Sequence, residues 1–346
     1  MKVLKQVLGV DVAQKELVVT LGRMHEDLSI ELYAHKVFKN SENGFTALLS
    51  WVNKLSDKNQ KVRFVMEATG VYHQKFAYYL EEKEYEISIV LPNKISSYIR
   101  TLENKTITDK SCSEAIAQFG LERKLDLWLR PNKLYTNLQQ LTRERDQIVA
   151  ERVVVKNQLH AESAQGDPHE KSLQRLKARI RFLNEQEKEI KYDIEAYIKE
   201  DENLNQQIEN ICTIPGVGRL TAVIVLAETN GFELIRNKKQ LVSYAGFDIK
   251  EKLSGTSVKG KPRISKRGNR NLRKAMHLPS LSAVKYDKHF KDIYTRIVSK
   301  HDIKMKALIA VQRKLLEMIY ILHKNKCPYD KNYEGIKENR AQIQMV

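Results

Sequence analysis

Apolar and polar residues alternate in short runs through the first third of the chain, a pattern that predicts β-strands. Four runs are rich in apolar and β-branched residues: 5–12, 16–23, 62–70 and 86–92. Between the last two runs, aromatic and apolar residues recur at helical spacing: Tyr72, Phe76, Tyr79 and Leu80. Strands interrupted by a helix indicate a mixed sheet flanked by helices. We therefore expect an α/β domain over residues 1–128.

The middle of the chain changes to a helical pattern, with apolar positions separated mostly by three, four or seven residues. The first series contains Leu134, Leu138, Leu141, Ile148, Val155 and Leu159, with Arg145 and Arg152 interrupting it. The second series contains Leu173, Leu176, Ile180, Leu183, Ile190, Ile194 and Tyr197. Because residues 165–168 (QGDP) break the pattern, the two series predict an antiparallel coiled coil or helical hairpin over residues 129–205. Such an element either projects and mediates self-association or is an ordinary pair of packed helices.

The last third is predicted to be mostly helical, so the fold class is α/β plus α. A short apolar helix and a longer one are joined by Pro-Gly-Val-Gly at residues 215–218, in the manner of a helix-hairpin-helix. Further helical patterns follow at residues 272–284 and 306–324. We expect one domain over residues 206–330 and a flexible polar tail over residues 331–346.

Composition narrows the range of functions. The 346 residues carry a formal net charge of +17, with a pI near 9.5, which points first to a nucleic-acid partner. Three distant cysteines without CxxC spacing indicate neither a zinc site nor disulfides, and they favour a reducing, cytoplasmic compartment. No run approaches the ~20 apolar residues that span a bilayer, so no membrane partner is expected.

Three acidic residues stand at positions where a surface acid is not expected. Asp11 lies inside an apolar strand, Glu67 ends another, and Asp109 lies where a helix begins. A buried carboxylate is costly unless it is paired or binds a cation. If the three converge at one edge of the sheet, their oxygens suit Mg²⁺ or Mn²⁺, and two such ions about 4 Å apart promote phosphodiester cleavage. Ordinary roles compete at two positions, namely a helix cap by Asp109 or Thr108 and a plain strand end at Glu67.

A basic, hydroxyl-rich segment at residues 254–274 (SGTSVKGKPRISKRGNRNLRK) contains no acidic residue and is suited to hold a polyanion. The glycines of the Pro-Gly-Val-Gly turn can expose backbone N–H groups to a phosphate, although a tight turn between packed helices explains them equally. The predicted nucleic-acid contacts are Gly216, Gly218, Lys259, Lys261, Arg263, Lys266, Arg267, Arg270 and Arg273.

Five motifs occur in order along nearly the whole chain. They are GVDVAQKELVV (9–19), MEATGVYHQKFAYYL (66–80), NKTITDKSCSEAIAQFG (104–120), IPGVGRLTAVIVLAE (214–228) and YAGFDIKEKLSGTSVKGKPRISKRGNRNLRKAM (244–276). Together they resemble the DEDD-type insertion-sequence transposases whose recombination is guided by a bridge RNA. The resemblance implies a RuvC-like domain with an RNase H-type sheet carrying four acids, a coiled coil, and a C-terminal domain with a serine nucleophile. It also implies a homo-oligomer, dimeric or tetrameric, around the guide RNA and two double-stranded DNAs, donor and target.

Carried over to this chain, the resemblance assigns Asp11, Glu67 and Asp109 as the first three acids. It assigns Ser254 as the nucleophile, with Ser257 and Ser265 as alternatives. A serine hydroxyl attacks only with help from a base or a strongly polarised phosphate. The Lys and Arg residues of the basic segment can stabilise the charge on that phosphate.

The fourth acid is where this sequence departs from the family pattern. That pattern resembles T-D-x-x-D-[AS], whereas residues 108–113 read TDKSCS, so Cys112 occupies the last acidic position. Thiolate is a soft ligand, poorly suited to Mg²⁺. Glu114 is a candidate substitute, although two residues along a helix is a rotation of about 200°. Either three acids suffice, or Glu114 or water substitutes, or cleavage is impaired. The main expectation is a DNA recombinase, and the alternatives are a catalytically decayed nucleic-acid-binding protein and a metal-only junction nuclease.

Overall fold

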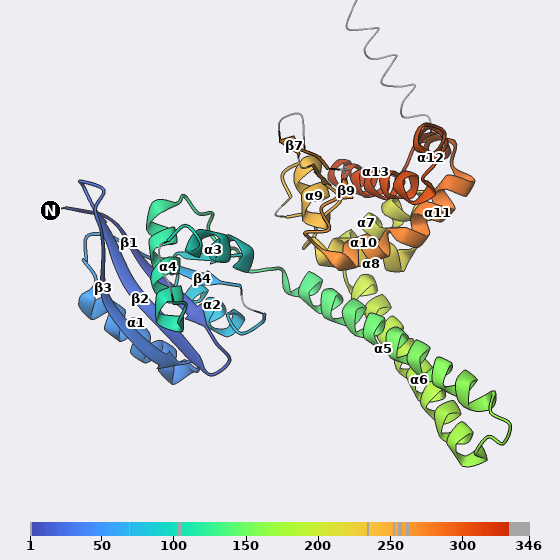
Figure 1. Cartoon of the computed structure of the whole chain (residues 1–346), viewed down its shortest axis with the longest axis horizontal. Coiled ribbons are helices and arrows are strands. Elements are labelled where there is room, and N and C mark those ends of the chain that lie inside the picture. The colour runs from blue at the N-terminus through green and yellow to red at the C-terminus, as the bar shows by residue number, and fades with distance from the viewer. Residues whose placement is uncertain are drawn as a thin grey trace, which may run out of the picture. The chain divides into compact units, whose positions relative to one another are not determined.

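The computed structural model describes residues 2–68, 70–102, 106–233, 235–251, 253–254, 258–260 and 263–331, with the backbone alone at 253–254 and 258–259. The chain divides into two compact units, Met1–Arg130 and Pro131–Val346 (Figure 1). The predicted finer division of the second unit near residue 205 stays a prediction. No helix in the described part of the chain combines the length and apolar character needed to cross a membrane.

Five strands of the first unit form one mixed sheet in the order β3-β2-β1-β4-β5 among the described residues. Their bounds are β1 Val3–Val12, β2 Glu16–His25, β3 Ile30–Lys39, β4 Val62–Glu67 and β5 Ile87–Val90. Strands β1, β2 and β3 pair antiparallel in sequence, whereas β4 runs parallel to β1 and β5 runs parallel to β4. The predicted mixed sheet is confirmed, and its strand order agrees with the RNase H-type sheet that the resemblance implies.

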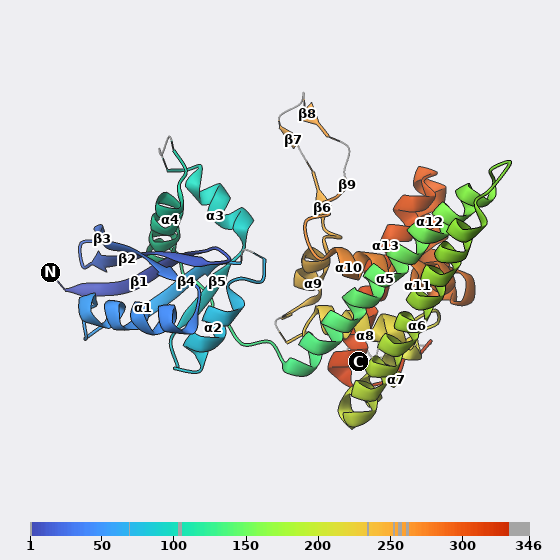
Figure 2. The ribbon, with the colours of Figure 1, turned by 90° about the horizontal axis from the view of Figure 1, so that it is seen from below.

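Helices cover both faces of this sheet (Figure 2). Helices α1 (Glu42–Leu55) and α2 (Gln74–Glu81) lie on one face, and α3 (Pro92–Ile99) and α4 (Asp109–Glu122) lie on the other. Successive side chains of a strand point to opposite faces. Leu8 and Val10 of β1 therefore belong to the core under α1 and α2, whereas Val7 belongs to the core under α4.

Strand β3 and helices α1 and α3 were not among the elements predicted from the sequence. Strand β3 lies at the edge of the sheet, and most of its side chains are exposed or half-buried, so it lacks a clear apolar alternation. Helix α1 is different, because its buried residues Phe45, Leu48, Leu49 and Val52 have helical spacing. Its pattern was readable in the sequence.

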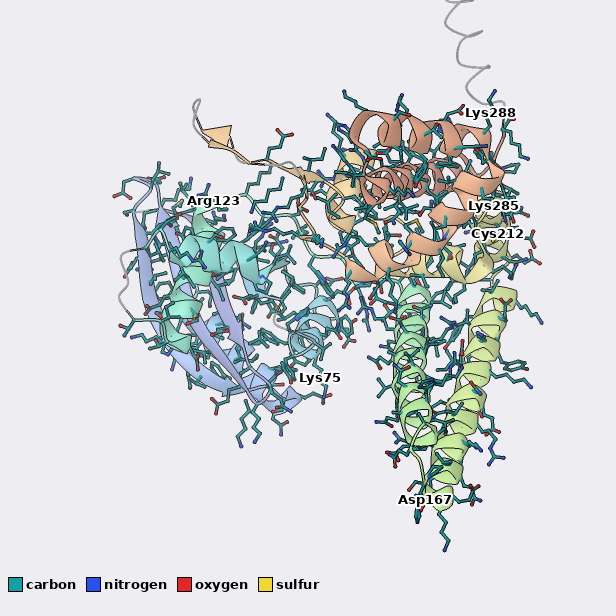
Figure 3. The ribbon with its side chains drawn as sticks, turned by 45° about the vertical axis from the view of Figure 1, so that its right-hand side comes forward. Lys75, Arg123, Asp167, Cys212, Lys285 and Lys288 are labelled. Atoms are coloured by element: carbon teal, nitrogen blue, oxygen red, sulfur yellow. The ribbon has the colours of Figure 1, made fainter. Side chains whose placement is uncertain are left out.

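The second unit begins with a long helical hairpin. Helices α5 (Lys133–Ser163) and α6 (Glu170–Glu200) lie side by side and antiparallel, with Asp167 in their connection (Figure 3). The predicted break at residues 165–168 therefore falls between them. Their inward apolar residues belong to the same core as the C-terminal helices. Coiled-coil packing in the strict sense stays a prediction.

The rest of the second unit is mostly helical, as predicted. The helices are α7 Glu202–Cys212, α8 Arg219–Glu228, α9 Lys238–Ala245, α10 Arg270–Ala275, α11 His277–Tyr286, α12 Lys288–His301 and α13 Lys304–Asn325. Four short strands lie between α9 and α10: β6 Ile249–Lys250, β7 Leu253–Ser254, β8 Val258–Lys259 and β9 Arg263–Ile264. Residues 332–346 of the predicted tail lie outside the described residues.

Candidate active site

Asp11 and Glu67 lie side by side on the face of the sheet that α4 covers. Strands β1 and β4 are parallel neighbours, with Val10 opposite Met66, so the next residue of each strand is Asp11 and Glu67. Side chains alternate between the two faces of a sheet, and Asp11 lies four residues after Val7 on β1. Asp11 therefore shares the face of Val7. The strand register alone therefore brings these two predicted acids together.

Helix α4 approaches this face unusually closely, and Gly9 of β1 makes the approach possible. A Cβ atom at Gly9 would lie 2.3 Å from the backbone nitrogen of Ala117 and 2.4 Å from the carbonyl oxygen of Ser113. Next to this contact, the buried hydroxyls of Ser113 and Thr20 lie 2.7 Å apart. Glycine is required here because only its missing side chain leaves room for the helix backbone. The docking brings the first turn of α4 toward Asp11.

The start of α4 is capped by Thr108 and not by Asp109. The Thr108 hydroxyl accepts a hydrogen bond from the Ser111 backbone N–H at 3.2 Å, and the Ser111 hydroxyl accepts one from the Thr108 N–H at 2.8 Å. This reciprocal capping box satisfies the helix end without the carboxylate of Asp109. Asp109, as the first residue of the helix, is left available for another role.

The acids act on one another electrostatically. Burial raises the pKa of Asp11 to about 6, and the negative charges of Asp109 and Glu67 contribute to this rise. Burial also raises the pKa of the Cys112 thiol, with further contributions from Asp11, Glu67 and Asp109. The four positions therefore share one local field, and Cys112 occupies the place at which the family pattern has an acid. Its thiol is neutral at neutral pH.

Glu114 does not belong to this group in the structure. It pairs with Lys110 on its own helix, with 3.8 Å between Lys110 Nζ and Glu114 Oε1. Its charge is not among those that raise the pKa of Asp11. The helix explains the difference: Cys112 follows Asp109 by three residues and stays on the same face, whereas Glu114 follows by five and does not.

The donor atoms of the site fit a hard divalent cation. Three carboxylates are the oxygen ligands that Mg²⁺ and Mn²⁺ prefer, and a cation relieves the repulsion that raises the pKa of Asp11. Among the described residues, no three His, Cys, Asp or Glu side chains lie close enough to hold one ion as they stand. The site thus supplies ligand types that suit the ion, although the described side chains do not already form a cluster around one point.

The predicted nucleophile lies on a narrow β-ribbon in the second unit (Figure 2). Strand β6 pairs with β9, and β7 pairs with β8, with Ser254 opposite Val258. Ser254 is the last residue of β7. The side chains of Ser254 and Lys259, and residues Gly255, Ser257 and Lys261, lie outside the described part of the structure.

The other residues of the basic segment fall into two groups. The side chains of Arg263, Lys266, Arg267 and Arg270 are exposed. Arg273 instead donates a 2.7 Å hydrogen bond from Nη1 to the carbonyl oxygen of Ala245, and burial lowers its pKa. The alternative nucleophile Ser265 is also engaged, because its hydroxyl donates to Asp248 Oδ1 at 2.6 Å.

The Pro-Gly-Val-Gly turn packs against α11 through Gly216. This residue has φ +91°, and a Cβ there would lie 2.7 Å from the Ser282 Cβ and 2.8 Å from the Pro279 carbonyl oxygen. Gly218 precedes α8 and has open space where a Cβ would lie. Packing therefore explains the glycine at position 216, whereas the space beside Gly218 would accommodate a side chain. Nucleic-acid contact by either glycine stays a prediction.

Glu228, the last residue of α8, was not among the functional residues predicted from the sequence. Its side chain is 1% exposed, and it pairs with Arg143 of α5. A weak signal was present, because an acid ends the otherwise apolar run TAVIVLA of residues 221–227. Glu187 of α6, which pairs with Arg145 and Arg152, was likewise not predicted from the sequence.

Comparisons with known proteins identify relatives over most of the chain. A family model of DEDD-type IS110 elements, described as a transposase, matches residues 8–162, and the "Transposase IS116/IS110/IS902 family" model matches residues 208–295. The "Pilin gene-inverting protein" of Moraxella bovis is 25% identical over 334 residues, covering 94% of this chain and 98% of the relative. The protein of the same name from Moraxella lacunata matches at the same identity and coverage. A solved structure of RuvC from Thermus thermophilus with a Holliday junction substrate covers 36% of this chain and 99% of its own, with 10% identity and a TM-score of 0.28.

The motifs, the family models and the relatives from Moraxella define the class of protein as a DNA transposase, an enzyme of DNA recombination. Within that class, the chain belongs to the DEDD-type transposases of the IS110 family. The family resemblance and the enzyme class predicted from the sequence are thereby confirmed. Membership also implies dependence on a divalent metal ion.

Proposed function

We propose that this transposase cuts and rejoins donor and target DNA through Ser254 and a Mg²⁺ or Mn²⁺ site formed by Asp11, Glu67 and Asp109. The observation that carries the metal site is the meeting of two parallel strand ends and the start of α4 at one place. There, Glu67 and Asp109 contribute to the raised pKa of Asp11. A bound divalent metal supplies positive charge to the oxygens of the scissile phosphate. The three carboxylates bind and orient that ion.

In the proposed covalent step, Ser254 Oγ forms a bond to phosphorus while the bond from phosphorus to the leaving strand's oxygen breaks. The serine proton passes to a base or to solvent, and the leaving oxygen takes up a proton. The position of Ser254 at the end of β7 in the ribbon supports this role, because a narrow ribbon can enter a DNA groove. The exposed Arg263 and Arg267 can neutralise the phosphate charge.

The proposed partners are double-stranded donor and target DNA, a bridge-type guide RNA and further copies of this chain in a dimer or tetramer. The net charge of +17 supports binding to polyanions. The relatives from Moraxella are named for inverting a gene, an outcome that requires DNA strands to be cut and rejoined. The guide RNA and the oligomer rest on the family resemblance.

A second candidate function follows from Cys112. Its thiol stands among the acids in place of a fourth carboxylate, so the chain is alternatively a nucleic-acid-binding protein with a decayed cleavage site. This alternative predicts salt-sensitive binding to DNA without metal-dependent strand transfer. A metal-only nuclease, the third possibility, requires Asp11 but not Ser254.

The test is to trap the protein on a nicked DNA substrate and to compare four variants with the unaltered chain. We expect Ser254→Ala to abolish the covalent adduct and Asp11→Ala to abolish metal-dependent cleavage. Ser265→Ala is the matched control, because its hydroxyl already bonds to Asp248, and it should keep the adduct. A full adduct from Ser254→Ala would refute the nucleophile, and activity gained only in Cys112→Asp would favour a decayed site.

A further inference from the structure

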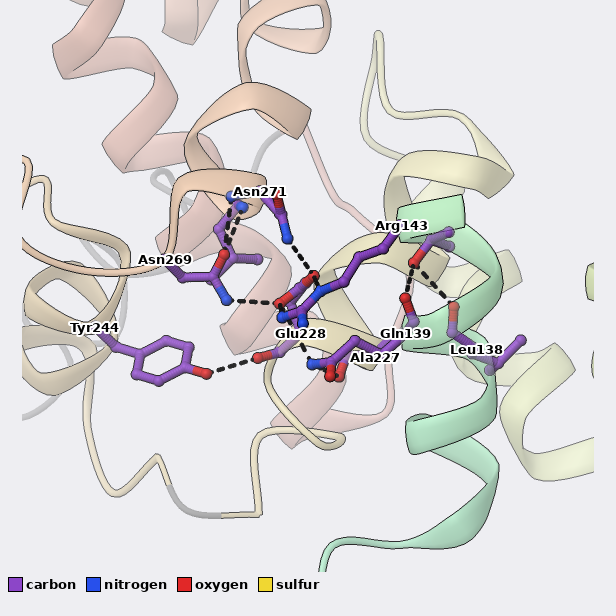
Figure 4. Close-up of polar contacts among 10 residues, drawn as sticks. Leu138, Gln139, Arg143, Ala227, Glu228, Tyr244, Asn269 and Asn271 are labelled. Atoms are coloured by element: carbon purple, nitrogen blue, oxygen red, sulfur yellow. Dashed lines mark hydrogen bonds and ion pairs between the residues drawn. The ribbon is translucent and has the colours of Figure 1, made fainter. Parts of the chain in front are cut away.

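The second unit contains a buried carboxylate with an unusually complete set of partners (Figure 4). Glu228 Oε1 accepts hydrogen bonds from Arg143 Nε and Asn271 Nδ2, both at 2.8 Å. Glu228 Oε2 accepts from Arg143 Nη2 at 2.8 Å, from Asn269 Nδ2 at 2.7 Å and from Gln139 Nε2 at 3.3 Å. We name these five residues the Glu228 cluster. They come from α5, α8 and the start of α10.

The cluster holds the end of residues 265–269, which lead from strand β9 to α10 and form the base of the β-ribbon. Asn269 immediately precedes α10, and its Oδ1 accepts from the backbone N–H groups of Asn271 and Leu272 at 2.9 and 3.1 Å. Its own backbone N–H donates to the Tyr244 carbonyl oxygen at 2.7 Å. The Tyr244 hydroxyl in turn donates to the Glu228 carbonyl oxygen at 2.9 Å. The base of the ribbon is therefore tied to the end of α8 through both side chain and backbone.

The opposite side of the cluster belongs to the hairpin. Gln139 and Arg143 are one helical turn apart on α5, and Asp146, three residues further, pairs with Lys274 of α10. One face of α5 therefore contacts both the Glu228 carboxylate and the helix that follows the basic segment. Through these contacts, α5 is linked to the base of the ribbon.

The chemistry of Glu228 suits a fixed joint better than proton transfer. Burial alone would raise its pKa, but the hydrogen bonds from Arg143, Asn269 and Asn271 lower the pKa below its usual value. The carboxylate is thus ionised at neutral pH, and its bidentate bonds to a guanidinium have a defined geometry. An ionised, fully bonded carboxylate has no proton to give.

We propose that Glu228 is a positioning residue for strand transfer: it holds the base of the β-ribbon against α5, so that Ser254 meets the scissile phosphate in one orientation. This inference rests on the proposed function, because it assumes that the ribbon carries the reacting group. It extends that function by making the hairpin part of the reaction geometry. A partner that binds the hairpin acts on the ribbon through the Glu228 cluster.

The first measurement is the rate of covalent adduct formation on nicked DNA, together with DNA affinity and the midpoint of urea unfolding. Glu228→Gln keeps the size of the side chain and removes its charge. We expect the rate to fall about tenfold or more, because small misplacements of a reacting group are costly, while DNA affinity stays within about threefold. Glu317→Gln is the matched control, because Glu317 is also buried and pairs with Arg313 and Lys314 of its own helix. It should keep the full rate.

Further variants keep the inference testable if Glu228→Gln does not fold. The Arg143 side chain is about half exposed, so Arg143→Ala should fold and show the same loss of rate. Arg143→Lys, which keeps the charge but not the bidentate bonds, should restore part of the rate. An equal rate in Glu228→Gln and Glu317→Gln, or a loss explained by weaker DNA binding, would overturn the positioning role.

The second measurement does not depend on which residue attacks the DNA. Spin labels at the exposed positions Gln147 of α5 and Lys250 of the ribbon, in a background whose native cysteines are serine, report the distance between these elements. We expect one narrow distance distribution, which broadens in Glu228→Gln and not in Glu317→Gln. An unchanged distance distribution would refute the role of Glu228 in holding the base of the ribbon against α5. An adduct that persists in Ser254→Ala refutes the proposed nucleophile instead, so the two failures are distinguishable.

Discussion

Replacing Glu187 by glutamine is expected to destabilise the helical hairpin, because this carboxylate is shared by three cations. It lies on α6 with a side chain that is 7% exposed. Oε1 accepts from Arg145 Nη2 at 2.8 Å and from Lys191 Nζ at 2.9 Å, and Oε2 pairs with Arg152. The substitution keeps the shape of the side chain and removes its charge. Two arginines that are about one-fifth exposed then lose their counter-ion.

The expected magnitude follows from the pKa of Glu187. Burial alone would raise this pKa, but the hydrogen bonds from Lys191 and Arg152 and the charge of Arg145 lower it from 4.5 to about 2. At about 1.36 kcal/mol per pKa unit, this difference corresponds to at most roughly 3 kcal/mol of unfolding free energy at pH 7. Because Lys191 is half exposed and partly screened by water, we expect a loss of about 2 kcal/mol.

The stabilisation by Glu187 is expected to depend on pH. Since the pKa of Glu187 is lower in the folded protein, its stabilising contribution is complete above about pH 4.5 and disappears as the pH falls toward 2. The assay is urea unfolding followed by helical circular dichroism at pH 7, 5 and 3. Glu151→Gln is the control, because its pair with Arg179 in the same hairpin is exposed and 3.7 Å long, and should be worth at most about 0.5 kcal/mol. Equal unfolding midpoints for Glu187→Gln and Glu151→Gln at pH 7, or a difference that does not shrink at pH 3, would refute the reasoning.

Three further predictions concern the active site and the turn before α8. Cys112→Asp places a fourth carboxylate among the acids, so Mg²⁺ should raise the melting temperature of this variant more than that of the unaltered chain. The stabilisation by a bound ion reaches about 2.7 kcal/mol when its concentration is 100 times Kd. Equal shifts of the two melting temperatures in calorimetry would contradict a shared metal site. Gly9→Ala drives a Cβ into the backbone of α4 and should cost about 1–3 kcal/mol in urea unfolding, whereas Gly166→Ala, with open space around it, should cost far less. Gly216→Ala should be destabilising by a similar amount, because of its φ of +91° and its contact with α11, while Gly218→Ala should change unfolding by less than about 0.5 kcal/mol. Similar unfolding midpoints for the last two variants would contradict the packing account.

The common sheet face of Asp11 and Glu67 follows from short-range rules, whereas the metal-binding role of these acids stays a prediction. An acid inside an apolar strand, as at Asp11, has few ordinary explanations, and parallel strands bring their carboxyl ends to one edge. The helical period also distinguishes Cys112 from Glu114 as the residue that faces the sheet. What the sequence left open at Asp109 was the identity of the cap, and the hydroxyl of Thr108 fills that role.

The partners of the buried charges could not be predicted, because they lie far apart along the chain. Arg145 and Arg152 interrupt the predicted apolar series of this helix, and that series alone gives them no partner. The structure instead pairs both with Glu187 of α6. No local pattern states that an arginine and a glutamate some 40 residues apart will meet. The docking role of Gly9 was hidden for the same reason, since it depends on a helix about a hundred residues later.

The arginines of α5 make this helix a connection between two buried carboxylates. Arg145 and Arg152 are seven residues apart, so they share the face toward Glu187 and α6. Arg143 is rotated from Arg145 by about 200° and points to the other side, where Glu228 joins α8 to the base of the ribbon. Breaking either pair leaves a buried charge without its counter-ion, which is destabilising. The two charge pairs on opposite faces of α5 add directional contacts to its apolar packing against α6 and α8. The hairpin therefore has a physical reason to carry charge in its core: it holds the ribbon of the proposed nucleophile in a defined position.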